Sequence, residues 1–367
     1  MNRIISGRKF RCRANGVGRA LLGLGVSLAM AVSILMAPLT VQANPYTVKP
    51  GEAPVTVAFA TCATTGGFIH AYTAMDNGLF DKYGIKINFV PIQGSKVALP
   101  ALASDQIQFL YCAADATIPG LAAGIDGKLV AAVHIGLPWI LLARKDIKKV
   151  EDLKGKSIGV TQIGSYDHRV TKVLLKRFNL EKEVTIRAMG GGSQPERYQA
   201  MVMDIIQATP LGAPLDVRGK RDGFNLIYDL NALSDDPDLP AIYSSLLTNS
   251  NTLKKQPALV QRFVAAIAET IHFAEKNPEK AKASIAKALK LDDPEALQSA
   301  YNAYAKALIN RRMLVPAHGV EKSVEIARDG GTSIKKKPSE IFDNTFVENL
   351  DKSGFLKELW GGEVPVK

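Results

Sequence analysis

Residues 55–90 read VTVAFATCATTGGFIHAYTAMDNGLFDKYGIKINFV, and this stretch decides the fold. Val55 to Ala60 is a continuous apolar run, which is typical of a buried strand. Apolar residues then recur at helical spacing from Phe68 to Leu79, and Ile85 to Ile92 alternates as a second strand. Strand, helix and strand in this order predict a parallel sheet covered by helices on both faces.

The same alternation continues and then restarts in the second half of the chain. Later strands are predicted at Ile107 to Cys112, Leu129 to Val133, Trp139 to Ala143, Ser157 to Thr161 and Val184 to Met189. A short sequence segment that echoes in both halves indicates that the halves share one arrangement of strands and helices. Asp105-Gln106-Ile107-Gln108 and Asp204-Ile205-Ile206-Gln207 both place Asp-x-Ile-Gln between a predicted helix and a predicted strand. From Gln256 onward the pattern becomes mainly helical.

The first 43 residues form a separate segment with the pattern of an export signal. They hold six of the 46 Lys and Arg side chains and no acidic side chain. All six basic residues precede an uncharged run from Ala20 to Thr40. Val41-Gln42-Ala43 offers the small residues that signal peptidase accepts, so we predict cleavage before Asn44. A retained membrane anchor is the alternative, because the apolar run is long enough to span a bilayer.

Composition and motifs exclude several classes of function. The chain has 367 residues, 47% of them hydrophobic and 22% charged, as in soluble globular proteins. Residues after 43 carry 40 basic against 35 acidic side chains without a basic stripe, so we predict no nucleic-acid partner. The five histidines are scattered, which predicts no metal site and no cofactor. Gly155-Lys156-Ser157 lacks the leading glycine of a phosphate loop, and no catalytic motif is found.

Two cysteines remain after the export segment, Cys62 and Cys112. Each closes an apolar run that is predicted to be a strand, and an oxidising compartment would allow them to pair. Two buried free thiols are an equally good interpretation of the same residues. The sequence pattern alone leaves both alternatives open.

Small polar loops follow the predicted strands in both halves, for example Thr61 to Gly67 and Gln162 to His168. In open parallel sheets the carboxyl ends of the strands border the ligand crevice, and helices that begin there point N–H groups into it. Six such loops predict a cleft for a small polar solute, although ordinary helix capping explains any single loop.

Several motifs resemble one family of transport proteins from about Pro54 to Phe355. They are AMDNGLF (74–80) followed by Tyr83-Gly84-Ile85, ALAS (101–104), VEDLKGKSIGV (150–160), Gly190-Gly191-Gly192 and Phe342-Asp343-Asn344. The chain resembles the periplasmic substrate-binding proteins of ABC importers, in the nitrate/sulfonate/taurine and thiamine-pyrimidine-precursor (NMT1/THI5-like) group. It departs from the family in both Asp-x-Ile-Gln segments, where the acidic position is shifted by three, so ligand contacts of typical members do not transfer.

This resemblance implies an α/β type II periplasmic-binding-protein fold. Two lobes, each with a mostly parallel sheet flanked by helices, would be joined by two crossover strands and close on the ligand. We expect lobe 1 at 54–143 plus 254–367, lobe 2 at 150–247, and hinge segments at 144–149 and 248–253. The resemblance makes the strands that end at Cys62 and Cys112 neighbours, which favours a disulfide.

The resemblance also implies the function. We expect a monomeric periplasmic protein that captures a small-molecule solute for an ABC permease and its ATPase, and that meets the membrane only through the permease. The alternatives are an enzyme of the thiamine-pyrimidine or menaquinone-synthesis type on the same fold, and a ligand-sensing partner of a membrane receptor. Two isolated cysteines do not supply the Cys-rich motif of the pyrimidine-forming branch.

The ligand is expected to be an organic anion, a sulfonate or a carboxylate. Helix starts near Ser165 and Ser193 would supply N–H donors, with support from His168 and from Arg169 or Arg197. Phe68, Trp139 and Tyr166 would wall the organic part, although core packing is the default for the first two. The predicted ligand-binding residues are Thr64, Thr65, Phe68, Gln93, Ala114, Asp115, Trp139, Ser165, Tyr166, His168, Gly192, Ser193 and Pro210.

Overall fold

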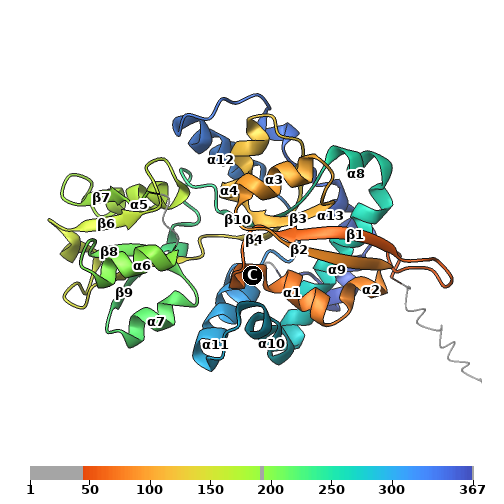
Figure 1. Cartoon of the computed structure of the whole chain (residues 1–367), viewed down its shortest axis with the longest axis horizontal. Helices are drawn as coiled ribbons and strands as arrows, with labels where there is room; N and C mark the ends of the chain where they lie inside the picture. Colours follow the sequence, from red (N-terminus) through yellow and green to blue (C-terminus); the bar gives the residue numbers. More distant parts are fainter. Residues whose placement is uncertain (1–43, 191–193, 366–367) are drawn as a thin grey trace, which may run out of the picture. The chain divides into compact units, whose positions relative to one another are not determined.

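The computed structural model describes residues 44–190 and 194–365, and their strands form two five-stranded sheets (Figure 1). The export segment expected at 1–43 lies outside the described residues. The first sheet has the order β2 (Ile85–Pro91), β1 (Val55–Thr61), β3 (Phe109–Ala113), β10 (Ile242–Thr248), β4 (Lys128–Ile135). The second has the order β7 (Thr185–Ala188), β6 (Ser157–Val160), β8 (Ala208–Gly212), β5 (Trp139–Ala143), β9 (Asn225–Asp229).

Both sheets follow one pattern of pairing. In the first sheet β1 pairs in parallel with β2 and β3, and β10 runs antiparallel between β3 and β4. In the second sheet β6 pairs in parallel with β7 and β8, and β5 runs antiparallel between β8 and β9. The antiparallel strand occupies the same place in each sheet. The predicted α/β class, with two look-alike halves of mostly parallel strands, is confirmed.

The strand pairing shows that the chain passes between the two sheets at positions other than the expected hinge segments. β5 belongs to the second sheet, so the expectation that Trp139 to Ala143 lies in lobe 1 is wrong. The chain crosses at 136–138, between β4 and β5, and returns at 230–241, between β9 and β10. The expected hinge segments lie elsewhere: 144–149 follows β5, and 248–253 covers the end of β10 and part of α8 (Ser250–Lys255). The charged link after Ala143 resembles a boundary in sequence, but the preceding strand has already changed sheets.

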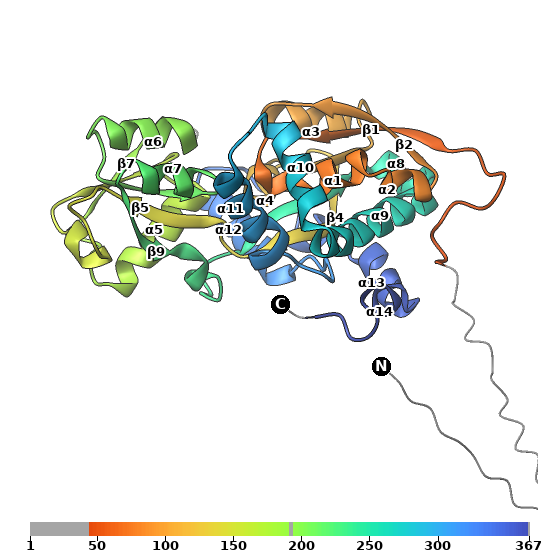
Figure 2. The same ribbon diagram turned by 90° about the horizontal axis from the view of Figure 1, so that it is seen from below.

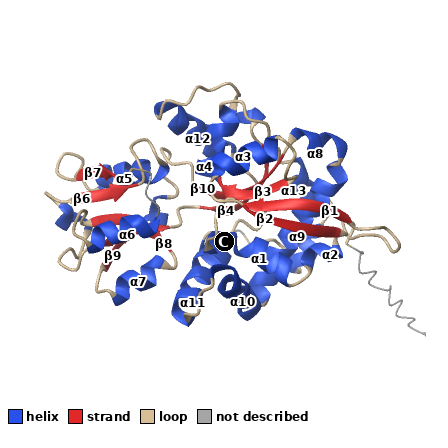
Figure 3. Cartoon of the chain, viewed as in Figure 1, coloured by secondary structure: helices blue, strands red, loops and turns tan. Residues whose placement is uncertain are grey.

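Helices cover both faces of each sheet (Figures 1–3). On one side of the first sheet lie α1 (Ile69–Asp76), α2 (Leu79–Lys82), α9 (Pro257–Lys276), α10 (Pro278–Leu289) and α11 (Pro294–Asn302), and on the other lie α3 (Ser95–Ala103), α4 (Ala114–Ala122) and α12 (Ala317–Asp329). The chain ends in α13 (Thr345–Lys352) and α14 (Phe355–Trp360), which pack against α9. The second sheet is flanked by α5 (Tyr166–Arg177), α6 (Gln194–Val202) and α7 (Leu215–Arg221). Short helical turns are η1 (Gly66–Phe68), η2 (Val150–Leu153), η3 (Leu230–Leu233), the π-helical η4 (Ala303–Ala307) and η5 (Pro338–Glu340).

The first sheet packs its core against α9. Phe263 stacks on Phe109 with ring centroids 3.8 Å apart, and Phe59 packs edge-on against the Phe263 ring with centroids 5.1 Å apart. Val264, Ile267 and other members of the apolar stripe on this helix are fully buried, as an amphipathic helix requires. No helix among the described residues combines the length and apolar character that crossing a membrane requires.

The repeated Asp-x-Ile-Gln segment has the same structure in both halves. Asp105 and Asp204 both adopt a positive φ, at 62° and 61°, which Asp tolerates better than most residues. The Gln108 side chain then accepts a hydrogen bond from the N–H of Ala58 at 2.9 Å, and Gln207 accepts one from Ser157 at 3.0 Å. Gln108 thus anchors β1 and Gln207 anchors β6, the strand at the corresponding place in the second sheet, so the echo in sequence reflects a structural repeat.

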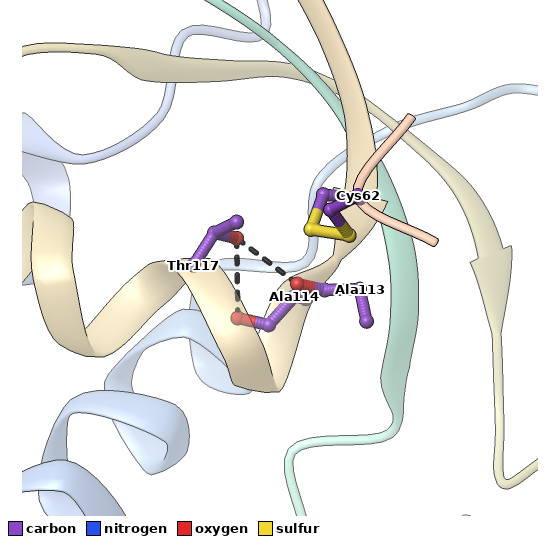
Figure 4. Close-up of a disulfide and its surroundings, with 5 residues drawn as sticks. Cys62, Ala113, Ala114 and Thr117 are labelled. Atoms are coloured by element: carbon purple, nitrogen blue, oxygen red, sulfur yellow. Dashed lines mark hydrogen bonds between the residues drawn. A yellow bond between two sulfur atoms is a disulfide. The ribbon is translucent and has the colours of Figure 1, made fainter. Parts of the chain in front are cut away.

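Cys62 and Cys112 are joined by a disulfide (Figure 4). Their Cα atoms lie 5.2 Å apart, which is possible because β1 and β3 are parallel neighbours. Beyond the bridge, Thr117 donates a hydrogen bond to the carbonyl of Ala113 at 3.1 Å in the first turn of α4 (Figure 4). Of the two alternatives that the sequence left open, the disulfide is the one found.

Candidate functional site

A cleft of about 670 Å³ is lined by residues from both halves of the molecule. The first half contributes Gln93 to Lys96, at the start of α3, and Asp115 and Ala116, in the first turn of α4. The second half contributes the loop 161–166, between β6 and α5. The end of α12 completes the wall. This volume falls in the range of pockets that hold small organic molecules.

The loops on the first-sheet side follow strands at their carboxyl ends, as predicted. Thr65 caps η1, where its hydroxyl accepts a hydrogen bond from the N–H of Gly67 at 3.0 Å. The exposed Thr64 accepts one from the amide of Gln93 at 3.4 Å. Gln93 and Asp115, two of the predicted ligand-binding residues, line the cleft.

Asp115 is the carboxylate in the cleft wall, and its side chain is exposed to the cleft. Loss of bulk water around this group, and next the charge of Asp167, raise its pKa to about 6. Burial raises the pKa of Tyr243 to about 12, with Asp115 among the smaller causes. Burial also raises the pKa of Tyr166, and Asp115 is the second cause. These couplings place Asp115 close to an aromatic side chain from each half.

The N-terminus of α5 carries its own carboxylate. Asp167 is buried and accepts hydrogen bonds from the N–H of Thr161 at 2.8 Å, from the Thr161 hydroxyl at 2.9 Å and from the N–H of His168 at 3.1 Å. The Ser165 hydroxyl also contacts this carboxylate. A helix N-terminus favours negative charge, and here a side chain of the chain itself supplies that charge.

Arg197 lies behind this carboxylate, only 3% exposed. Its guanidinium is 3.6 Å from Asp167, donates to the Thr161 hydroxyl at 2.8 Å and donates to the carbonyl of Pro210 at 3.1 Å. The buried pair therefore fixes the base of the 161–166 loop. Pro210, a predicted ligand residue, is itself buried in β8 and contributes its carbonyl to this network.

Tyr166 forms the aromatic part of the cleft wall. Its ring meets Trp139 edge-on with centroids 5.3 Å apart, and its hydroxyl accepts a hydrogen bond from the N–H of Ala241 at 3.1 Å. Trp139 is largely buried and lines a second, smaller hollow of about 250 Å³ between β5, β8 and α11. Tyr166, a predicted ligand-binding residue, lines the cleft, whereas Trp139 does not line it and packs against the Tyr166 ring.

Other predicted residues lie away from the cleft surface. Phe68 is buried in the core of the first half, edge-on to Tyr111 with ring centroids 5.0 Å apart. Ala114 is fully buried. Ser165 lines the cleft, but the half-buried His168 does not, and its Nδ1 accepts a hydrogen bond from Gly164 at 3.1 Å. Gly192 and Ser193 lie outside the described residues.

Burial is the first cause that lowers the pKa of His168, followed by the charge of Lys172. Arg169 forms ion pairs across to α12, with Glu325 at 2.7 Å and Asp329 at 3.3 Å. The sequence predicts that His168, with either Arg169 or Arg197, supports an anion. Among the described residues that line the cleft, none of these three basic side chains is present.

Ion pairs join the two halves on both flanks of the cleft. On one flank Arg169 of α5 meets α12, as described above. On the other, Arg221 of α7 contacts Asp293 and lies 2.7 Å from Glu295 of α11. Ser299 of α11 also donates to Asp216 of α7 at 2.5 Å. These ion pairs and this hydrogen bond are polar contacts between the halves.

The predicted ligand-binding residues do not include Lys96 or the end of α12, which line the cleft, nor Asp167, which is buried at the base of the 161–166 loop. Ser165-Tyr166-Asp167 at a helix start is a capping pattern that could have revealed Asp167. Nothing in the local sequence places α12, more than 150 residues away, beside that loop. No group of three or more His, Cys, Asp and Glu residues is placed to hold a metal ion within 44–190 and 194–365.

Comparisons with known proteins agree with this architecture. The family model described as NMT1/THI5 like matches residues 66–281. A Brucella abortus (strain 2308) protein, named only as a candidate binding protein, is 24% identical over 306 residues, which cover 83% of this chain and 88% of that protein.

Two solved structures share the fold. The periplasmic sulfonate-binding protein SsuA from Methylobacillus flagellatus KT gives a TM-score of 0.66 at 19% identity, over 83% of this chain and 96% of that one. The periplasmic aliphatic sulphonate binding protein SsuA from Escherichia coli gives 0.64 at 20% identity, over 79% and 97%. The periplasmic-binding-protein fold expected from the sequence motifs is confirmed.

Proposed function

Because the chain belongs to the NMT1/THI5-like family, we propose that it is a periplasmic solute-binding protein of an ABC importer. It captures a small polar organic solute that carries an acid group, a sulfonate or a carboxylate, and delivers the solute to a permease. The observation that carries this proposal is the cleft of about 670 Å³, which is lined by strand-end loops from both sheets.

The composition of the cleft wall supports a polar solute. Lys96 is the one Lys or Arg among the described residues that line the cleft, and it is exposed. Gln93 and Gln162 add amide groups on opposite sides. An ammonium group and amide donors can pair with the oxygens of a sulfonate or a carboxylate. The two SsuA structures are named for sulfonates, which agrees with this ligand class.

Transport of the solute without a chemical change fits the same residues. Cys62 and Cys112 are bonded to each other, so neither offers a thiolate nucleophile. The buried carboxylate Asp167 is paired with Arg197 and held by Thr161, which makes it part of the scaffold. Recovery of an unaltered solute by mass spectrometry would distinguish binding from catalysis.

The site of action and the partners follow from the proposed role. The basic and apolar segment at 1–43 would export the chain. Two halves joined by short crossing segments would close on the solute, and the closed form would be the one that an ABC permease recognises. We propose that the protein works as a monomer and meets the membrane only through that permease.

A thermal-shift screen of the purified protein tests the proposal. The compounds are alkyl sulfonates, carboxylates, nitrate, pyrimidines and apolar aromatic compounds, because binding to the native state raises the melting temperature by mass action. We expect a rise with at least one organic acid, and the solute should be recovered unchanged. A rise with apolar compounds alone, or steady conversion of the solute, would contradict the proposed function.

A further inference from the structure

The cleft holds two side chains of opposite charge that the scaffold leaves available. Lys96 begins α3 and Asp115 lies in the first turn of α4, and both line the same cleft. Both are exposed to it. Helices α3 and α4 pack against each other, so the two groups belong to one rigid wall. A wall that carries both a positive and a negative side chain differs from the prediction based on helix starts, in which the wall offers only hydrogen-bond donors.

Within residues 44–190 and 194–365, Asp115 has no cationic side-chain partner. Its carboxylate accepts hydrogen bonds from the backbone N–H groups of Asp115 and Ala116, in the first turn of α4, but none from another side chain. This sets it apart from Asp167, which is neutralised by Arg197 at 3.6 Å and by the hydroxyl of Thr161. A carboxylate in a partly desolvated cleft gains from a charged or strongly polar donor, and the solute is the molecule that can supply one.

The neighbours of Asp115 favour a cation over a neutral donor. Tyr166 lines the cleft beside Asp115, and its hydroxyl is occupied by the N–H of Ala241. An aromatic ring carries a quadrupole whose face attracts positive charge. An acid group placed against Asp115 would be repelled, so an anionic solute must direct its acid group elsewhere in the cleft. Lys96 is the group in the described wall that can receive it.

We propose that Asp115 determines specificity by binding a protonated amine of the solute while Lys96 binds its acid group, so that the preferred ligand is a small amino acid-like zwitterion. The inference rests on the proposed function and narrows its ligand class. Apart from the backbone N–H groups of its own helical turn, Asp115 holds no other group in the described structure, so its role can be separated from the packing of the fold.

Matched probes test the inference in the wild-type protein. We compare 2-aminoethanesulfonate with propanesulfonate, and 3-aminopropanoate with butanoate, by isothermal titration calorimetry. In each pair a methyl group replaces the ammonium group at nearly constant size. We expect the amino compound of at least one pair to bind at least about tenfold more tightly, because a site built for a donor rejects the analogue that lacks it.

The variant Asp115→Asn should abolish that preference, because it keeps the shape and removes the charge. Affinity for the amino compound should fall by at least about tenfold, whereas affinity for its methyl analogue should stay equal or improve. Asp292→Asn is the matched control, because Asp292 is exposed and lines neither hollow. Lys96→Gln should weaken both members of a pair alike.

Failure of the inference can be told apart from failure of the proposed function. If the methyl analogue binds wild type as tightly as the amino compound, the role of Asp115 is refuted and the solute-binding function stands. If Asp115→Asn keeps the preference, the role is also refuted. If none of the four probes binds and only compounds without an acid group do, the ligand class and the inference fail together. Should Asp115→Asn not fold, the comparison of probes in wild type still decides.

Discussion

Removal of the Cys62–Cys112 disulfide should lower the free energy of unfolding markedly. The bridge joins residues 50 positions apart. Closing a loop of that length removes chain entropy from the unfolded state, which corresponds to about 4 kcal/mol at 25 °C in the loop-entropy relation. A loss of this size is a large part of the 5–15 kcal/mol that typically stabilises a domain, by rough estimate. The double variant Cys62→Ala/Cys112→Ala should therefore unfold at clearly lower denaturant.

Guanidinium titration followed by tryptophan fluorescence measures this difference. Wild type, wild type with a reducing agent, and the double variant are compared under the same conditions. Addition of reductant should move wild type towards the double variant and leave the double variant unchanged. Because a cross-link also alters the unfolded state, the slope of the transition should be larger without the bridge.

The bridge lies close in sequence to residues of the cleft wall, so the same variants also test whether the disulfide affects solute affinity. Cys62 precedes Thr64, and Cys112 precedes Asp115 by three residues. β1 and β3 remain paired without the bridge through Phe59 to Thr61, so solute affinity well below the unfolding transition should change little. A stability loss below about 1 kcal/mol would refute the loop-entropy argument, and a large loss of affinity in the folded variant would refute the separation of stability from binding.

Three further predictions concern charged and titratable groups. Arg197→Met should lower the free energy of unfolding in chemical denaturation by about 3–5 kcal/mol, because it leaves Asp167 buried without its partner. Adding Asp167→Asn should restore part of this stability. A loss below about 1 kcal/mol would contradict the argument. Arg169→Gln should change stability by less than about 1 kcal/mol yet weaken solute binding several-fold in calorimetry, because its ion pairs join the two halves; unchanged affinity at low salt would exclude that role. His134 is buried with a pKa lowered from 6.5 to about 4, so its contribution is present above 6.5 and is lost as the pH falls towards 4. The loss should reach up to about 3 kcal/mol, and His134→Gln should flatten the profile of unfolding free energy between those values; an identical profile would refute the assignment.

Much of the fold could be predicted from local patterns. The strand at Val55 to Ala60, the alternating strand at Ile85 to Ile92 and the apolar stripe of α9 are close to the observed elements, because each is set by burial of one face. The Asp-x-Ile-Gln echo correctly indicated two similar halves. Here the information is local, since Asp105 and Asp204 adopt the same turn and Gln108 and Gln207 make the same contact.

The crossing points could not be predicted in the same way. β5 has the apolar composition of any buried strand, and nothing in Trp139 to Ala143 states which sheet it joins. That choice depends on the pairing of β5 with β8 and β9, which lie far along the chain. The charged residues after Ala143 form a surface turn, and a surface turn occurs within a half as readily as between halves.

The charge of the solute was the hardest property to infer from helix starts. The argument for an anion assumes that N–H groups at those starts are free, but the chain supplies its own acceptors. Thr65 caps η1, and Asp167 occupies the first turn of α5. A helix start in sequence shows that donors exist and not whether a nearby side chain already uses them. Selection between solutes therefore depends on the groups left without a side-chain partner at the cleft wall, and among those described the charged ones are Lys96 and Asp115.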